Sequence, residues 1–184
     1  ASYVTAKYLQ KLYPPRAYND ETCFTANYSS VELADGSFAE PRTWAADQKE
    51  FVITHASNYF NSYAKGHLTV IKALQLVRQQ GVNARVCFIG DGPLREEFAQ
   101  KARELGVGDY VDFTGRLANG DEVRKVMKSS DLFILPTYAE GIPRVLLEAM
   151  SMGLPCLSSP ICGIPEVLKP DYLYDFDDYE GFAK

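Results

Sequence analysis

The sequence predicts an α/β domain built around a parallel sheet with helices on its faces. From Phe51 onward, short apolar runs alternate with longer amphipathic stretches, as expected when crossover helices join parallel strands. One of the amphipathic stretches, residues 67–80, places apolar side chains at helical spacing. The chain has 184 residues, of which 46% are apolar and 23% charged, so it can bury a core without disulfides or metals.

Each element of the alternation can be placed on the sequence. Gly81 supplies a stop for the first helix, and Pro93 suits a first helical turn, where a missing N–H costs nothing. We expect strands at residues 51–56, 84–90, 110–115, 131–136 and 154–159, with residues 172–174 as a candidate sixth. We expect helices at residues 67–80, 93–105, 121–128 and 143–152.

Residues 1–45 do not share this alternation. They contain a short predicted helix at 4–13, then Pro14 and Pro15, then a polar stretch that runs to Pro41. Their few apolar groups would make a poor independent core, so we interpret residues 1–45 as the tail of a preceding domain plus a linker. Residues 46–184 would form the second domain. The chain stops inside a predicted helix, 178–184, and we expect both ends to be truncated.

Composition excludes several classes of function. The 24 acidic residues outnumber the 19 basic ones, which gives a formal charge of -5 and no electrostatic footprint for nucleic acid. No apolar stretch approaches the roughly 18 residues needed to span a bilayer, and no signal peptide opens the chain. The four cysteines form no CxxC pair, so we expect reduced and mostly buried thiols, as in a cytoplasmic protein.

The segment PTYAEGIPRVLLEAMSMGLPCLSS is the most informative for chemistry. It follows a predicted strand and opens a helix, with Glu140 in the connecting loop and Glu148 within the helix. Ligands of open α/β sheets collect beyond the carboxyl ends of the strands, where helix N-termini present free N–H groups. Gly141, Ile142 and Pro143 lie at such a place, where Gly141 allows close approach of a ligand and Pro143 fixes the entry of the helix.

The two carboxylates suit different hydroxyl groups. Glu148 accepts hydrogen bonds only, so it suits a vicinal diol such as that of a ribose. Glu140 could accept hydrogen bonds from sugar hydroxyls near a leaving phosphate. The alternative for Glu140 is an exposed loop acid that the helix dipole favours.

Several ordered blocks of the sequence resemble one enzyme family. EGIPRVLLEA resembles the E-x7-E signature of the retaining GT-B glycosyltransferases of the group-1, or family-four, class. AKGHLTVIKAL, ARVCFIGDGPL, VDFTGRL and CGIPEVL follow the order and spacing of that family, over roughly Phe51 to Leu168. The opening YVTAKYLQKLYPP also resembles the last helix of the acceptor-side domain. The resemblance implies a Rossmann-like domain that binds the nucleotide sugar, in a protein about twice as long.

The resemblance implies a role for further residues. Enzymes of this family use no bound metal and no cofactor, and Lys65 matches their diphosphate-binding lysine. The alternative for Lys65 is a solvated surface lysine. The family's usual arginine is missing, because Asn58 and Tyr59 stand about where it would lie. Arg144 or a residue of the absent domain could compensate.

Two further turns are implied in donor binding. The turn that contains Gly90 and Gly92 lacks the GxGxxG pattern, so it is a weak candidate for an NAD site. The resemblance places this turn beside the donor site. The alternative is a plain tight turn. Arg116 and Leu117 lie where similar proteins contact the nucleotide base, although Arg116 could be a surface charge. We interpret the acidic YDFDDY as a solvated helix start rather than a metal site, and His67 as structural.

Together these implications give retaining transfer of a glycosyl group from a nucleoside diphosphate sugar to an acceptor hydroxyl. The acceptor would be a saccharide or lipid-linked saccharide held by the missing N-terminal domain, and polysaccharide or glycolipid assembly follows from the family alone. Peripheral association of the full-length protein with the inner face of the membrane stays open. The alternatives are a nucleotide-sugar epimerase of the same architecture, a non-catalytic nucleotide-sugar-binding module and, last, an NAD oxidoreductase. Base, donor sugar, acceptor and oligomeric state are left open.

Overall fold

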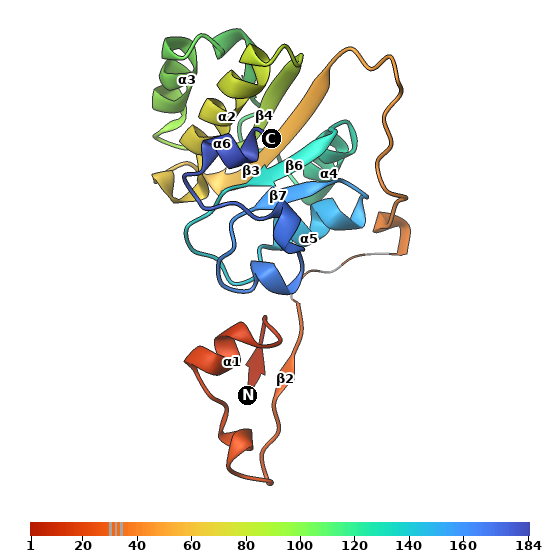
Figure 1. Ribbon diagram of the computed structural model, residues 1–184. Helices are drawn as coiled ribbons and strands as arrows, with labels where there is room; N and C mark the ends of the chain where they lie inside the picture. Colours follow the sequence, from red (N-terminus) through yellow and green to blue (C-terminus); the bar gives the residue numbers. More distant parts are fainter. Residues whose placement is uncertain (30, 32, 34) are drawn as a thin grey trace.

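A five-stranded parallel sheet forms the centre of the molecule (Figure 1). The computed structural model describes residues 1–29, 31, 33 and 35–184. The strands of this sheet lie in the order β5-β4-β3-β6-β7. Their bounds are β3 Phe51–Tyr59, β4 Ala84–Asp91, β5 Val111–Phe113, β6 Leu132–Leu135 and β7 Cys156–Ser158. The predicted α/β fold class and the five predicted strands are confirmed.

Helices cover both faces of the sheet (Figure 1). On one face lie α2 His67–Gln79, α3 Arg95–Glu104 and the short α6 Tyr179–Phe182. On the other lie α4 Gly120–Lys128 and α5 Arg144–Ser151. Each layer has its own core: Ile71, Leu74 and Phe98 pack with Val86 and Phe88 in the first. The second core packs α4 and α5 against the opposite face of the strands, through Met127, Leu146, Phe133 and Leu135.

Several predicted boundaries were wrong. Residues 172–174 add no sixth strand to the sheet, because Leu173 forms only an isolated parallel bridge with Ser158 and then enters a loop. The predicted helix 4–13 shortens to α1 Tyr8–Leu12. α3 and α5 begin one or two residues after their prolines, since Pro143 is the N-cap of α5 and the turn at Pro93 precedes α3. Only Cys156 of the four free cysteines is buried, whereas we expected most of them to be.

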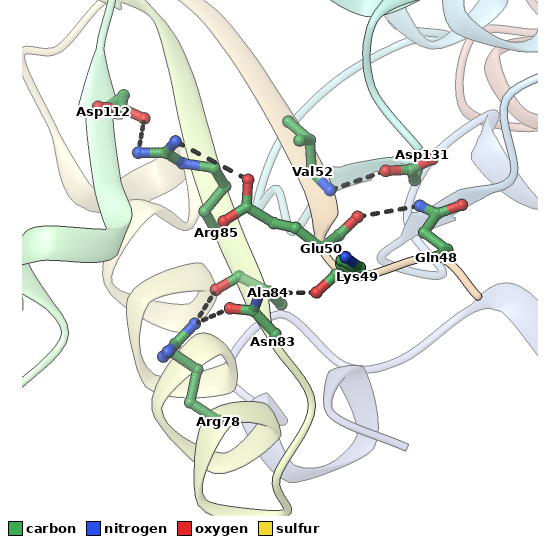
Figure 2. Close-up of polar contacts among 10 residues, drawn as sticks. All are labelled: Gln48, Lys49, Glu50, Val52, Arg78, Asn83, Ala84, Arg85, Asp112 and Asp131. Carbon is green, nitrogen blue, oxygen red and sulfur yellow. Dashed lines mark hydrogen bonds and ion pairs between the residues drawn. The ribbon is translucent and has the colours of Figure 1, made fainter.

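Charged residues gather at the edge of the sheet where the strands begin (Figure 2). Arg85 of β4 forms an ion pair with Asp112 at 2.9 Å, and Glu50 lies 3.9 Å from its other terminal nitrogen. At the start of β6, the Asp131 carboxylate accepts a hydrogen bond from the Val52 N–H at 2.8 Å. These contacts join the starts of neighbouring strands to one another.

The first residues of the chain pack beside the sheet domain as a small extension (Figure 1). This extension holds α1 and a two-residue parallel pairing of β1 Ser2–Tyr3 with β2 Ala26–Asn27. Glu166, at the end of the 3-10 turn η5 Ile164–Glu166, joins the two parts, because its carboxylate accepts hydrogen bonds from the N–H groups of Ala6, Lys7 and Tyr8. Burial raises the pKa of Glu166, but these backbone donors outweigh it and hold the pKa below its ordinary value.

Two histidines lie fully buried in the first core. His55 of β3 and His67 of α2 have ring centroids 4.5 Å apart, and His67 stacks on Phe98 at 4.5 Å. Burial lowers the pKa of His55 from 6.5 to about 4 and that of His67 to about 2. Both rings are therefore neutral in the folded protein at neutral pH, and the interpretation of His67 as structural agrees with its burial among aromatic rings.

The histidine pair predicts an acid-sensitive fold. Both folded-state pKa values are depressed, so proton binding by the unfolded chain does not lower the stability above pH 6.5, and stability falls as the pH drops from 6.5 toward 4. Between about pH 6.5 and about pH 5 each histidine should lower the free energy of unfolding by about 2 kcal/mol. Urea denaturation across this range measures the decrease. His67→Phe should remove about half of it, and an unchanged pH dependence in this variant would contradict the assignment.

Candidate functional site

The order of the strands singles out one place on the sheet. From β3 the chain moves through β4 to β5 on one side, and it then returns to place β6 and β7 on the other. Because the strands are parallel, the loops after β3 and β6 diverge at the same edge. This is the topological switch point at which ligands of open α/β sheets bind.

The loops after β3 and β6 are tied together at that edge. The 3-10 turn η3 Tyr63–Lys65 lies after β3, and its Ala64 carbonyl accepts hydrogen bonds from the Tyr138 N–H at 2.9 Å and the Thr137 hydroxyl at 3.3 Å. Gly66 follows with a φ of 70°, and a Cβ there would lie 2.2 Å from the Pro136 carbonyl oxygen. Only a residue without a side chain permits this approach of the two loops.

The same contact brings Lys65 and Glu140 together. Although 75 positions separate them, the ammonium of Lys65 forms an ion pair with the Glu140 carboxylate. The two side chains are 31% and 27% exposed, so each can still reach a ligand. The sequence singled out both residues without predicting this pairing.

Glu148 lies in the second turn of α5 and is partly exposed. The helix begins at Arg144 with Pro143 as N-cap, which offers no side chain to the first N–H groups. An uncapped helix start of this kind carries a partial positive charge and free donors. Arg144 is exposed at this helix start. Asn58 and Tyr59, which stand where the resemblance implied an arginine, are also exposed and lie at the end of β3.

The loop between Glu140 and α5 is packed from below by other parts of the chain. The Gly141 carbonyl accepts a hydrogen bond from the Gly163 N–H at 2.9 Å, and the Val4 side chain lies 3.1 Å from where a Gly141 Cβ would be. A Cβ on Gly163 would lie 2.5 Å from Ile142. The extension and the loop after β7 therefore shape the backbone of Gly141 and Ile142.

A groove of about 780 Å³ lies between the extension and α5. Ile142 and Leu147 line it on one side, and Lys7, Tyr8 and Lys11 on the other. Neither Glu140 nor Glu148 lines this groove, so the two carboxylates do not share it. No sequence pattern indicated the groove, because its walls come from opposite ends of the chain.

The remaining predicted residues lie along the same edge of the sheet. Gly90 has a φ of 130°, and a Cβ there would lie 1.7 Å from the Ser57 carbonyl oxygen, while a Cβ on Gly92 would lie 2.5 Å from the Phe60 nitrogen. Packing against the end of β3 thus requires both glycines. Arg116 is exposed, and Leu117 packs partly into the second core.

One residue at this site escaped the sequence analysis. His55 lies on β3, and its Nε2 is 2.6 Å from the Lys65 carbonyl oxygen. A histidine beside Thr54 in the predicted strand 51–56, whose other residues are apolar, was the available signal. Its hydrogen-bond partner follows from tertiary structure alone.

Metal sites and membrane helices were also considered. The described part of the chain has no group of three or more His, Cys, Asp or Glu side chains arranged to hold a metal ion. Within those same residues, no helix is long and apolar enough to cross a membrane. The acidic segment 175–178 is a helix start, because the Asp178 carboxylate accepts a hydrogen bond from the Gly181 N–H at 2.8 Å and caps α6.

Comparison with known proteins finds related sequences and folds. Protein CapJ of Staphylococcus aureus is 29% identical over 184 residues, which is 100% of this chain and 44% of CapJ. HepE of Anabaena, in complex with UDP and glucose, is 25% identical, with a TM-score of 0.65 over 73% of this chain and 37% of HepE. The lipopolysaccharide outer core galactosyltransferase WaaB in its apo form has a TM-score of 0.76 at 21% identity, over 99% of this chain and 50% of WaaB.

The chain spans half or less of the length of each of these three relatives. The structural neighbours are GT-B glycosyltransferases, so the fold that the resemblance implied is confirmed. The family model "Glycosyl transferases group 1" matches residues 50–184. This chain therefore belongs to the group 1 glycosyl transferases.

Proposed function

We propose that this chain binds the nucleotide-sugar donor of a retaining glycosyltransferase at the switch point between β3 and β6. The observation that supports it most directly is the Lys65–Glu140 ion pair beside the uncapped start of α5. A cation, a helix N-terminus and a carboxylate at one edge are suited to a diphosphate that is attached to a sugar. The UDP complex of the similar HepE supports a nucleoside diphosphate as ligand.

The diphosphate would lie between Lys65 and the backbone of Gly141 to Pro143. The leaving diphosphate gains negative charge as the glycosidic bond to it breaks, and preoriented donors stabilise that charge. We propose that Lys65 and the N–H groups at the start of α5 supply this stabilisation without a metal or a cofactor. Arg144, exposed in the first turn of α5, would contribute the second positive charge.

The rest of the donor would follow the same edge. Glu148 would accept hydrogen bonds from the ribose hydroxyls, and Glu140 would orient the donor sugar rather than attack it. Arg116 and Leu117 would flank the base, and the turn containing Gly90 and Gly92 would face the donor. These roles stay predictions.

The acceptor would come from a domain outside this chain. Residues 1–45 would be the tail of that domain and its linker, and the domain would present a saccharide or lipid-linked saccharide to the edge that carries Glu140. Association of the complete protein with the inner face of the membrane, and work in polysaccharide or glycolipid assembly, are part of this proposal. The groove beside α5 does not include the two carboxylates, so the missing domain would also have to close the donor cleft.

Lys65→Ala tests the diphosphate site. Calorimetric titration of the complete protein with UDP, GDP and ADP first identifies the base. Loss of the Lys65 ammonium should then weaken binding of that diphosphate by about tenfold or more, since a charge-assisted contact is worth roughly 1.5–3 kcal/mol. Affinity for the matching nucleoside should not change. Lys125→Ala, which removes an exposed lysine of α4, is the matched control. Equal effects in the two variants would argue against the site.

Glu140→Gln separates binding from transfer. Glu140 neutralises Lys65 in the ligand-free protein, so the amide should free the ammonium and tighten UDP binding by about threefold at low salt. Turnover should fall, because the donor sugar loses its carboxylate. Glu180→Gln, at an exposed position of α6, should change neither quantity. Weaker UDP binding by Glu140→Gln would contradict the competition between the carboxylate and the diphosphate.

The class of reaction is tested with the complete protein and a labelled donor. Sugar transfer with the donor's anomeric configuration in the product is the expected outcome, and the isolated chain should transfer nothing. Release of epimerised free sugar would indicate an epimerase. Donor binding without any turnover, with cellular activity unaffected by Glu140 or Lys65 variants, would indicate a binding module.

A further inference from the structure

His55 is a fully buried polar residue directly beneath the Lys65 turn. It lies near the middle of β3, pairs with Phe88 of β4 across the sheet and has no exposed surface. Its ring packs against His67 and Phe88. A neutral imidazole in such an apolar core costs desolvation unless it makes a useful hydrogen bond.

The single hydrogen bond of the ring fixes its tautomer. The Lys65 carbonyl oxygen can only accept, so Nε2 of His55 must carry the proton and donate across the 2.6 Å contact. The other nitrogen, Nδ1, is buried without a partner among the described residues. The Nε2–H donor beneath the Lys65 carbonyl is thus present together with an unsatisfied Nδ1 in the same ring.

That hydrogen bond completes the attachment of the turn. The neighbouring Ala64 carbonyl is held from the side by Thr137 and Tyr138 of the loop after β6. The Lys65 carbonyl is held from beneath by His55, which belongs to the central strand of the sheet. The successive carbonyl groups of Ala64 and Lys65 are thus fixed from two directions. The Lys65 side chain extends from this backbone, and its ammonium group reaches Glu140.

We propose that His55 is a positioning residue for the diphosphate subsite. It fixes the backbone of Lys65 so that the ammonium is preoriented toward the donor diphosphate. His55 does not touch the donor itself. This inference rests on the proposed function, because it assumes that Lys65 binds the diphosphate.

His67 provides a matched comparison within the same core. It is as buried as His55 and stacks in the same aromatic cluster, but both of its ring nitrogens lack partners among the described residues. If burial of a ring is all that the core needs, His55 and His67 are equivalent. If the donor to Lys65 matters, only His55 affects the diphosphate.

The test compares three variants of the complete protein: His55→Phe, His55→Gln and His67→Phe. Titration calorimetry measures the affinity for UDP and for uridine, or for the base that the protein prefers. His55→Phe should weaken diphosphate binding by about threefold to tenfold, the loss expected for one net hydrogen bond, and leave nucleoside affinity unchanged. His55→Gln, which keeps an N–H donor, should recover much of the loss, and His67→Phe should match the wild type.

The outcomes distinguish a failure of the His55 proposal from a failure of the proposed function. Wild-type protein that binds no nucleoside diphosphate would remove the proposed function itself. Wild-type binding with equal losses of UDP and uridine affinity in His55→Phe would show that the residue is merely structural, and so would an equal loss in His67→Phe. If His55→Phe fails to fold, the ratio of UDP to uridine affinity in His55→Gln and in His55→Asn, whose shorter amide cannot span the same gap, carries the decision. Equal ratios in these two would overturn the proposal.

Discussion

The pairing of β3 with β6 is the constraint on which the site depends. Ile53 and Thr54 of β3 lie opposite Leu132 and Phe133 of β6, although the paired residues are 79 positions apart in the sequence. Buried polar contacts support the pairing at its start, where the hydroxyls of Thr54 and Ser130 form a hydrogen bond. Since parallel neighbours end at the same edge, this register brings the Lys65 turn to the same edge as the loop that carries Glu140. A shift by one residue would turn the alternating side chains of β6 to the wrong face.

Glycine residues and backbone hydrogen bonds hold the loops close together at this edge of the sheet. Gly66, Gly90 and Gly92 all lie where a Cβ would collide with another segment. The loops can therefore approach within van der Waals distance, and carbonyl groups such as that of Ala64 find donors in the opposite loop. The side chains of Lys65 and Glu140 stay partly exposed, while the Ala64 and Lys65 carbonyl groups beneath them accept hydrogen bonds. A preorganised binding site of the kind we propose would require this combination.

The extension at the start of the chain is connected to this edge rather than independent of it. The Glu166 carboxylate accepts hydrogen bonds from three N–H groups of the extension, and Val4 lies against the Gly141 loop. A carboxylate that caps several backbone donors forms charge-assisted hydrogen bonds, which are stronger than neutral ones. The sheet domain and the extension meet at a groove that carries two lysines, in a chain whose net charge is negative.

The sequence by itself determined the fold class, the strands and the family. Alternating apolar and amphipathic segments depend on local burial, and the ordered motifs from Lys65 to Glu148 are continuous in the chain. Boundaries such as the start of α3 and the loss of a sixth strand were set by packing that local patterns do not encode. Only the tertiary structure decided that Lys65 pairs with Glu140, that His55 supports the Lys65 carbonyl and that Glu166 holds the extension. The physical reason is that each of these contacts joins residues through strand order and register, which the spacing along one chain does not specify.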